Sequence, residues 1–192
     1  MANTLVVIGG SSGGLEAMLA ILHQLPATYR VPTILVLHQK ANRISGVPQM
    51  LRSHTHLSVI EPDDKQLIEA GCLYVAPPNY HLLVEKEKIL SLSSDAPVNY
   101  CRPAIDVTLE AAADVYGKDL VVCILSGANH DGAQGCVCVK QKGGRVLVQC
   151  ADEASVSVMP DAAAKAVAVD GLMTLQEMAA QLASLSVAEI DK

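Results

Sequence analysis

The stretch LVVIGGSSGG, residues 5–14, decides the fold class, because it joins an apolar strand to a helix through a run of small residues. Residues 5–8 are aliphatic and mostly β-branched, which predicts a strand buried on both faces. Residues 9–14 are all glycine or serine and allow a tight turn. Residues 15–25 then carry their leucines and a methionine on one helical face. This strand, turn and helix predict the start of a βαβ unit in a parallel sheet.

Short apolar runs and segments with helical periodicity alternate along the rest of the chain. The predicted strands are residues 33–37, 57–60, 72–75, 120–125 and 145–148, and the predicted helices are residues 47–53, 103–117, 137–142, 159–167 and 175–185. Residues 81–84 and 89–92 are predicted to pair as a β-hairpin. The sequence therefore predicts an α/β fold with a doubly wound, mostly parallel sheet, flanked by helices, with the hairpin in its middle section.

Composition predicts one domain and excludes several kinds of partner. A hydrophobic share of 51% supplies enough apolar material for a single core, and we expect a core over residues 1–185 and a frayed tail over residues 186–192 within one domain, 1–192. The net charge of -6 and the aromatic content of 3% predict no nucleic-acid partner. No apolar run reaches the roughly 18–20 residues that span a bilayer, so we expect no membrane insertion.

Cysteine usage and the first residues bear on the compartment. The six cysteines show neither the spacing of a disulfide framework nor a CxxC pair. Residues 1–10 lack the basic region of a signal peptide. We therefore expect a cytoplasmic protein with reduced thiols.

Ser11 lies at the centre of Gly9-Gly10-Ser11-Ser12-Gly13, which fits the pattern G-x-S-x-G between a strand and a helix. Such a turn lifts the serine out of the sheet, and the helix that follows aims its first amides at the space beside the hydroxyl. The alternative interpretation is that this segment is a glycine-rich turn without a catalytic role. A dinucleotide loop is disfavoured, because G-x-G-x-x-G would place a serine at its second glycine.

His38 and Asp131 are the predicted partners of Ser11. His38 directly follows the strand at residues 33–37, and Asp131 lies in the loop after residues 120–125. The carboxyl ends of parallel strands meet at the ligand crevice of such sheets. We therefore expect His38 to act as general base and Asp131 to orient its imidazole. The remaining histidine and aspartate candidates do not directly follow the carboxyl end of a predicted parallel strand, so we expect solvated or structural roles for them. They are His23, His54, His56, His81, Asp106, Asp114 and Asp119.

Metal and cysteine chemistry are weaker interpretations. A site formed by His38, His130 and Asp131 has too few ligands with suitable spacing. The sequence pattern places no histidine beside Cys101, and the sulfurs of Cys136 and Cys138 would point to different sides of a helix. We therefore predict no metal and no reactive thiol.

Over nearly its whole length the chain resembles the catalytic domain of the CheB-type protein-glutamate methylesterases. The chain order Ser, His, Asp already differs from the Ser, acid, His order of standard α/β-hydrolases. The matching stretches are IGGSSGG at residues 8–14, His38, YVAPPNYH at residues 74–81, RPAIDV at residues 102–107, LSGANHDGAQG at residues 125–135, and EAS with a later MP within residues 153–160. Their shared order and spacing are far more specific than G-x-S-x-G alone.

The resemblance implies a mechanism and a substrate. Ser11 would attack the methyl ester of a receptor glutamate, with His38 moving the proton and Asp131 orienting His38; methanol leaves, and water then releases the acid. Backbone amides of Ser12 and Ala128 would form the oxyanion hole. The implied partners are the methylated cytoplasmic helices of chemoreceptors, the implied reactions include deamidation of receptor glutamines, and no metal or organic cofactor is needed.

Some features depart from the family pattern. Gln39 and Lys40 follow the histidine where methionine and proline are common, and Cys101 stands where a histidine usually precedes Arg-Pro; both bear on substrate fit. The N-terminal receiver domain usual in the family has no counterpart before residue 5, so we expect this chain to lack it. Two alternatives stay open: a small-molecule carboxylesterase with the same triad, and a non-catalytic nucleotide-binding module.

Overall fold

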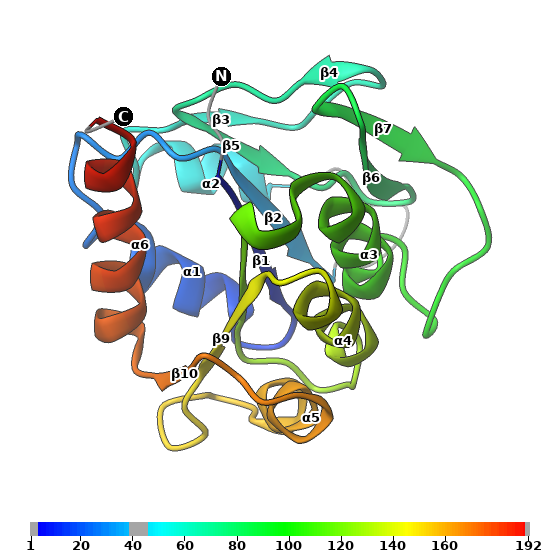
Figure 1. The fold of residues 1–192 in the computed structure, drawn as a ribbon, viewed down its shortest axis with the longest axis vertical. Helices are drawn as coiled ribbons and strands as arrows, with labels where there is room; N and C mark the ends of the chain where they lie inside the picture. Colours follow the sequence, from blue (N-terminus) through cyan, green and yellow to red (C-terminus); the bar gives the residue numbers. More distant parts are fainter. Residues whose placement is uncertain (1–3, 39–45, 191–192) are drawn as a thin grey trace.

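The computed structural model describes residues 4–38 and 46–190, and seven parallel strands form its central sheet (Figure 1). The strand order is β10-β9-β8-β1-β2-β5-β3. The bounds are β1 (Leu5–Gly10), β2 (Thr33–Leu37), β3 (Ser58–Ile60), β5 (Cys72–Val75), β8 (Leu120–Ile124), β9 (Arg145–Gln149) and β10 (Gly171–Met173). This arrangement confirms the predicted fold class. Gln39 and Lys40 lie outside the described residues.

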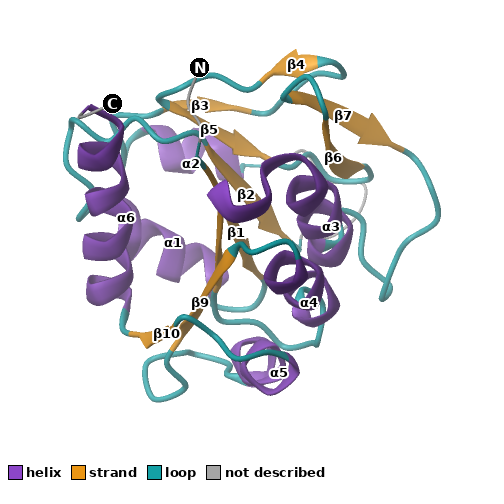
Figure 2. Ribbon diagram, in the orientation of Figure 1, coloured by secondary structure: helices purple, strands orange, loops and turns teal. Residues whose placement is uncertain are grey.

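Helices cover both faces of the sheet (Figure 2). They are α1 (Gly14–Leu22), α2 (Val47–Arg52), α3 (Ile105–Tyr116), α4 (Ala133–Gln141), α5 (Val158–Ala166) and α6 (Leu175–Ile190). Successive side chains of β1 point to opposite faces of the sheet, as in any pleated strand. Leu5 and Val7 pack in the core beneath α3, α4 and α5, whereas Val6 and Ile8 pack in the core beneath α1, α2 and α6. The strand is buried throughout, which explains its unbroken apolar sequence.

The predicted hairpin forms part of a second, antiparallel sheet. Its strands are β6 (His81–Glu85) and β7 (Ile89–Ser93), and a short β4 (Gln66–Leu67) pairs with β7. This small sheet lies over the α3 face, where Leu82, Val84 and Leu90 join the core. Thr108 on α3 donates a hydrogen bond from its hydroxyl to the Leu82 carbonyl. The hairpin therefore helps to fix α3.

The structure corrects several predicted boundaries. The sequence did not predict β4 or β10, which are very short strands of two and three residues. Helix α4 begins at Ala133 rather than at residue 137. Gly135 does not interrupt this helix, and its missing side chain leaves room for Leu109 of α3. Helix α6 continues to Ile190, past the predicted end at residue 185, in a segment free of glycine and proline. None of the described helices is long and apolar enough to cross a membrane.

Gly135 tests the close packing of α4 on α3. A Cβ at this position would lie 2.6 Å from Leu109 Cβ and 3.1 Å from the backbone of Asp106. We expect Gly135→Ala to lower the free energy of unfolding by about 1–3 kcal/mol, because this overpacking outweighs the helix-propensity gain of up to about 1 kcal/mol. Urea unfolding followed by circular dichroism measures the change.

Gly46→Ala is the matched control for this experiment. Among the described residues, no atom lies within 4 Å of a Cβ built at Gly46, and its φ of -83° suits alanine. Its effect should stay below about 1 kcal/mol. Equal losses in the two variants would contradict the packing argument.

Candidate active site

Three sheet connections bring the predicted residues to one edge. Strands β1 and β2 pair in parallel with Gly10 opposite Leu37, so Ser11 and His38 leave the sheet side by side. The His38 amide donates to the Gly10 carbonyl at 3.2 Å, and the Ser11 amide donates to the Ser126 carbonyl at 2.9 Å. Ser126 follows β8, which pairs with the other side of β1. The turn after β1 therefore lies between the segments that carry His38 and Asp131.

His38 and Asp131 are in direct contact. The distance from His38 Nε2 to Asp131 Oδ2 is 2.7 Å, and Asp131 is buried. The Asp131 carboxylate also accepts hydrogen bonds from the amides of Ile105 and Asp106, at 2.6 and 3.1 Å, at the start of α3. Burial alone would raise the pKa of Asp131, but the hydrogen bonds from His38 and these amides outweigh it and hold the pKa below its usual range. The carboxylate is therefore ionised at neutral pH.

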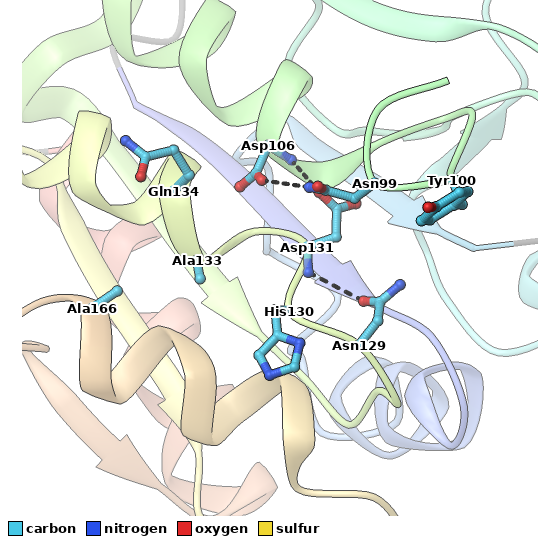
Figure 3. A pocket seen from close by; sticks show the side chains of 9 residues that line it. All are labelled: Asn99, Tyr100, Asp106, Asn129, His130, Asp131, Ala133, Gln134 and Ala166. Carbon is cyan, nitrogen blue, oxygen red and sulfur yellow. Dashed lines mark hydrogen bonds between the residues drawn. The ribbon is translucent and has the colours of Figure 1, made fainter. Parts of the chain in front are cut away.

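Asn129 identifies the accepting nitrogen of His38. Its Oδ1 accepts a hydrogen bond from the Asp131 amide at 3.2 Å (Figure 3). This orientation turns its Nδ2 toward His38 Nδ1, at 3.3 Å. The amide nitrogen can only donate, so Nδ1 carries the lone pair and Nε2–H donates to Asp131. This tautomer makes Nδ1 the nitrogen that can take up a proton.

Cys101 also reaches His38, which the sequence argument missed. Its Sγ lies 3.5 Å from His38 Nδ1 and 3.5 Å from Asn129 Nδ2. Two backbone hydrogen bonds between Val98 and Cys101, at 2.8 and 3.1 Å, close the two-residue turn that places it there. Burial, and then the charge of Asp131, raise the pKa of the Cys101 thiol. The only sequence signal was the cysteine before Arg-Pro, where the family usually has a histidine.

Asp106 was predicted to be structural, and the structure places it beside the candidate site. Its Oδ1 accepts hydrogen bonds from the amides of Gly132 and Gly135, at 2.9 and 2.7 Å. Asn99 Nδ2 donates to Asp106 at 3.0 Å and to Asp131 at 3.4 Å (Figure 3). Burial, with a contribution from the charge of Asp131, raises the pKa of Asp106. Asp106 therefore takes up a proton before Asp131 does, and it holds the start of α4 in place.

Ser11 lies in a turn that leaves nearby amides available. Its side chain is partly exposed, and its carbonyl accepts a hydrogen bond from the Gly14 amide at 2.9 Å. Gly13 has a φ of 78°, which favours glycine. Within residues 4–38 and 46–190, the Ser11 hydroxyl makes no hydrogen bond with His38, and the amides of Ser12 and Ala128 donate none. Both amides belong to exposed residues.

Two cavities flank the His38–Asp131 pair. One, of about 180 Å³, is lined by His38, Asn79, Pro97, Tyr100, Cys101, Arg102 and Pro103. The other, of about 440 Å³, is lined by Asn99, Tyr100, Asp106, Asn129, His130, Asp131, Ala133, Gln134 and Ala166 (Figure 3). Tyr100 borders both cavities, and its side chain is fully exposed. It is the only large aromatic side chain among these residues.

The other histidines lie outside this arrangement. His81 is buried, with Nε2 3.1 Å from the Ala96 carbonyl and Nδ1 accepting from the Ala104 amide at 3.2 Å. His23 and His54 contact one another, 2.6 Å apart, and line a separate pocket together with His56. The ring of His130 points away from the Asp131 carboxylate (Figure 3). The metal site with His130, which the sequence already disfavours, gains no support from the geometry.

A parallel α/β sheet with an imidazole–carboxylate pair beside a serine turn is an arrangement found in α/β serine hydrolases. A family model described as CheB methylesterase matches residues 6–182, and the chain belongs to this family. The resemblance drawn from the sequence is thus confirmed.

Relatives and a solved structure agree with this assignment. A protein of Leptospira interrogans is 41% identical over 174 residues, which cover 91% of this chain and 90% of its own. The protein-glutamate methylesterase/protein-glutamine glutaminase of Trichodesmium erythraeum is 34% identical over 93% of this chain, and only 51% of its own length is covered. The crystal structure of the Thermotoga maritima CheB methylesterase catalytic domain superposes with a TM-score of 0.91 at 28% identity, covering 96% of this chain and 100% of that one.

Asp106→Ala tests the support beneath the Asp131 loop. Removing the carboxylate takes the acceptor from the buried Gly135 amide and leaves the Gly132 amide with Asp131 alone. An unpaired buried amide costs about 1–3 kcal/mol, and we expect the free energy of unfolding to fall by about that amount in urea denaturation. Asp114→Ala on the same helix is the control, because its ion pair with Lys142 is mostly exposed and contributes little to stability. A similar loss in both variants would refute the supporting role of Asp106.

Proposed function

We propose that this chain is a serine-type protein-glutamate methylesterase that hydrolyses glutamate methyl esters, and deamidates glutamines, on cytoplasmic helices of chemoreceptors. The observation that carries the proposal is the hydrogen bond between His38 and Asp131 at the sheet edge where Ser11 also emerges. Membership of the CheB methylesterase family supports the reaction class. The Trichodesmium relative is named a protein-glutamate methylesterase/protein-glutamine glutaminase, which supports the substrate class.

In the first half of the reaction, Ser11 Oγ attacks the ester carbonyl carbon and His38 Nδ1 takes the hydroxyl proton. Asp131 stays ionised and stabilises the imidazolium through Nε2–H. The amides of Ser12 and Ala128 donate to the oxyanion of the tetrahedral intermediate. His38 then returns the proton to the leaving oxygen, which departs as methanol.

In the second half, water attacks the acyl-enzyme while His38 Nδ1 takes its proton. Collapse of the second tetrahedral intermediate frees the glutamate carboxyl group and returns the proton to Ser11 Oγ. Attack on a glutamine side chain follows the same steps, with ammonia in place of methanol.

Substrate binding must bring the Ser11 hydroxyl onto His38 Nδ1. In the described residues, Asn129 and Cys101 are the groups next to this nitrogen. Catalytic hydrogen bonds are often long in a free enzyme and tighten only in the substrate complex. Rotation of the serine side chain, with displacement of the Asn129 amide, would make the contact.

The surroundings favour a protein substrate over a small apolar ester. A pocket for a small-molecule ester would be lined predominantly by hydrophobic side chains. Here most residues that line the larger cavity are polar, and the exposed Tyr100 borders both cavities. This arrangement suits a side chain presented from the surface of a helix.

Ser11→Ala tests the proposed nucleophile. We expect methanol release from a methylated receptor preparation to fall by a factor of about 10⁴ or more, because the acyl-enzyme cannot form. Ser12→Ala is the matched control, since it keeps the backbone amide and should stay within about tenfold of the parent rate. If Ser11→Ala released methanol at the parent rate, or if the chain bound NAD or ATP saturably without any esterase activity, the proposal would fail.

Tyr100→Ala tests the choice of a protein substrate. Loss of an exposed aromatic contact should raise KM for the methylated receptor by about tenfold, which corresponds to about 1.4 kcal/mol, while kcat changes little. Tyr80→Ala is the control, because Tyr80 is also exposed but borders neither cavity. An unchanged KM in Tyr100→Ala would favour the small-molecule carboxylesterase.

A further inference from the structure

We propose that Cys101 and His38 form a reversible binding site for a soft divalent cation of the zinc type, and that the bound cation switches the esterase off. The inhibitory half rests on the proposed role of His38 as general base, whereas cation binding itself does not. In the described residues, His38, Cys101 and Asp131 form the one group of three metal-binding side chains whose donor atoms lie within 4.8 Å of one another.

The spacing of the two donor atoms fits one tetrahedral cation. Zinc lies about 2.3 Å from sulfur and about 2.0–2.1 Å from imidazole nitrogen, which at a tetrahedral angle puts the two ligands about 3.6 Å apart. Cys101 Sγ and His38 Nδ1 are 3.5 Å apart. Both donors are therefore at ligand spacing without any movement of the backbone.

Asp131 completes the arrangement from the far side of the ring. Metal-binding histidines usually donate their other N–H to a carboxylate, which fixes the tautomer and the ring orientation. His38 Nε2 lies 2.7 Å from the buried Asp131 carboxylate, so the Nδ1 lone pair is already directed away from Asp131. Nδ1 and Sγ thus act as direct ligands, and Asp131 acts as the outer partner.

The remaining coordination positions are open to water. His38 and Cys101 both line the cavity of about 180 Å³. Among the described residues that line this cavity, the one cationic side chain apart from His38 is that of Arg102. It donates to the carbonyls of Ser94 and Asp95 at 2.8 and 2.9 Å, which engages its guanidinium outside the donor pair. Two protein ligands and two waters make a weaker site than four protein ligands, so binding is reversible.

Binding exchanges one proton and transfers no electrons. The Cys101 S–H bond breaks, its proton goes to solvent, and the thiolate and the Nδ1 lone pair bond to the cation. The Asn129 amide, 3.3 Å from Nδ1, turns away to admit the cation. With its lone pair engaged, Nδ1 cannot accept the Ser11 proton, so ester hydrolysis stops until the cation leaves.

Titration of the full chain with zinc chloride, followed by calorimetry, tests the site. We expect one zinc ion per chain. Cys101→Ser should weaken binding by more than about 100-fold, because even the loss of an outer partner costs about 10–100-fold. Cobalt chloride should produce a thiolate-to-cobalt absorption band in the parent chain and none in Cys101→Ser. Cys138→Ser, which changes a partly buried thiol of α4 outside the cavity, should keep both signals.

A second arm separates this inference from the proposed function. Ser11→Ala should lose esterase activity and still bind zinc with the parent affinity. The ratio of activity in zinc to activity in excess EDTA should be low for the parent chain and near one for Cys101→Ser and Cys101→Ala. Undiminished zinc affinity in both Cys101 variants overturns the site, and zinc binding through Cys101 without inhibition overturns the switch.

Discussion

The hydrogen bond from His38 Nε2 to the Asp131 carboxylate is the interaction on which the rest of the site depends. Asp131 can remain charged in a buried place because the amides at the start of α3 and the imidazole together satisfy it. The bond fixes the orientation of the imidazole ring and leaves one ring nitrogen, Nδ1, to accept a proton. It also joins the end of β2 to the loop between β8 and α4, which lie on opposite sides of β1.

The packing of helices on one face of the sheet supports this bond. Asp106 and Asp131 are two neighbouring buried carboxyl groups, and the Asn99 amide, which donates to both, relieves their repulsion. Burial raises the pKa of Asp106, whereas hydrogen bonds hold the pKa of Asp131 below its usual range. Asp106 in turn holds the amides of Gly132 and Gly135, which lets α4 begin close to α3. The packing of α4 on α3 is therefore connected to His38 by the hydrogen bonds of Asp106, Asn99 and Asp131.

The sequence predicts well which residues lie at the edge of the sheet, but it predicts poorly which other side chains surround them. Ser11, His38 and Asp131 follow apolar runs whose length and β-branching mark buried parallel strands, so strand ends alone bring them to one edge. Cys101 and Asn99 lie on a loop whose path depends on the left-handed backbone of Asn99 and Tyr100, and no periodicity encodes it. Asp106 has an ordinary helical position in the sequence, and only the packing of α3 on α4 reveals its partners. The shortest strands, β4 and β10, carry too few residues for any pattern to appear.

The pairing of β1 with β8 has a consequence for how this protein becomes active. Leu5 pairs with Leu120, so the centre of the sheet closes only when distant parts of the chain meet. Closing so long a loop is entropically costly and slows folding. During synthesis, the first two strands can be complete long before β8 leaves the ribosome, and a nascent chain at that stage has an imidazole without its carboxylate. The His38–Asp131 pair can therefore form only late in the maturation of the chain, after β8 and the loop that follows it have been made.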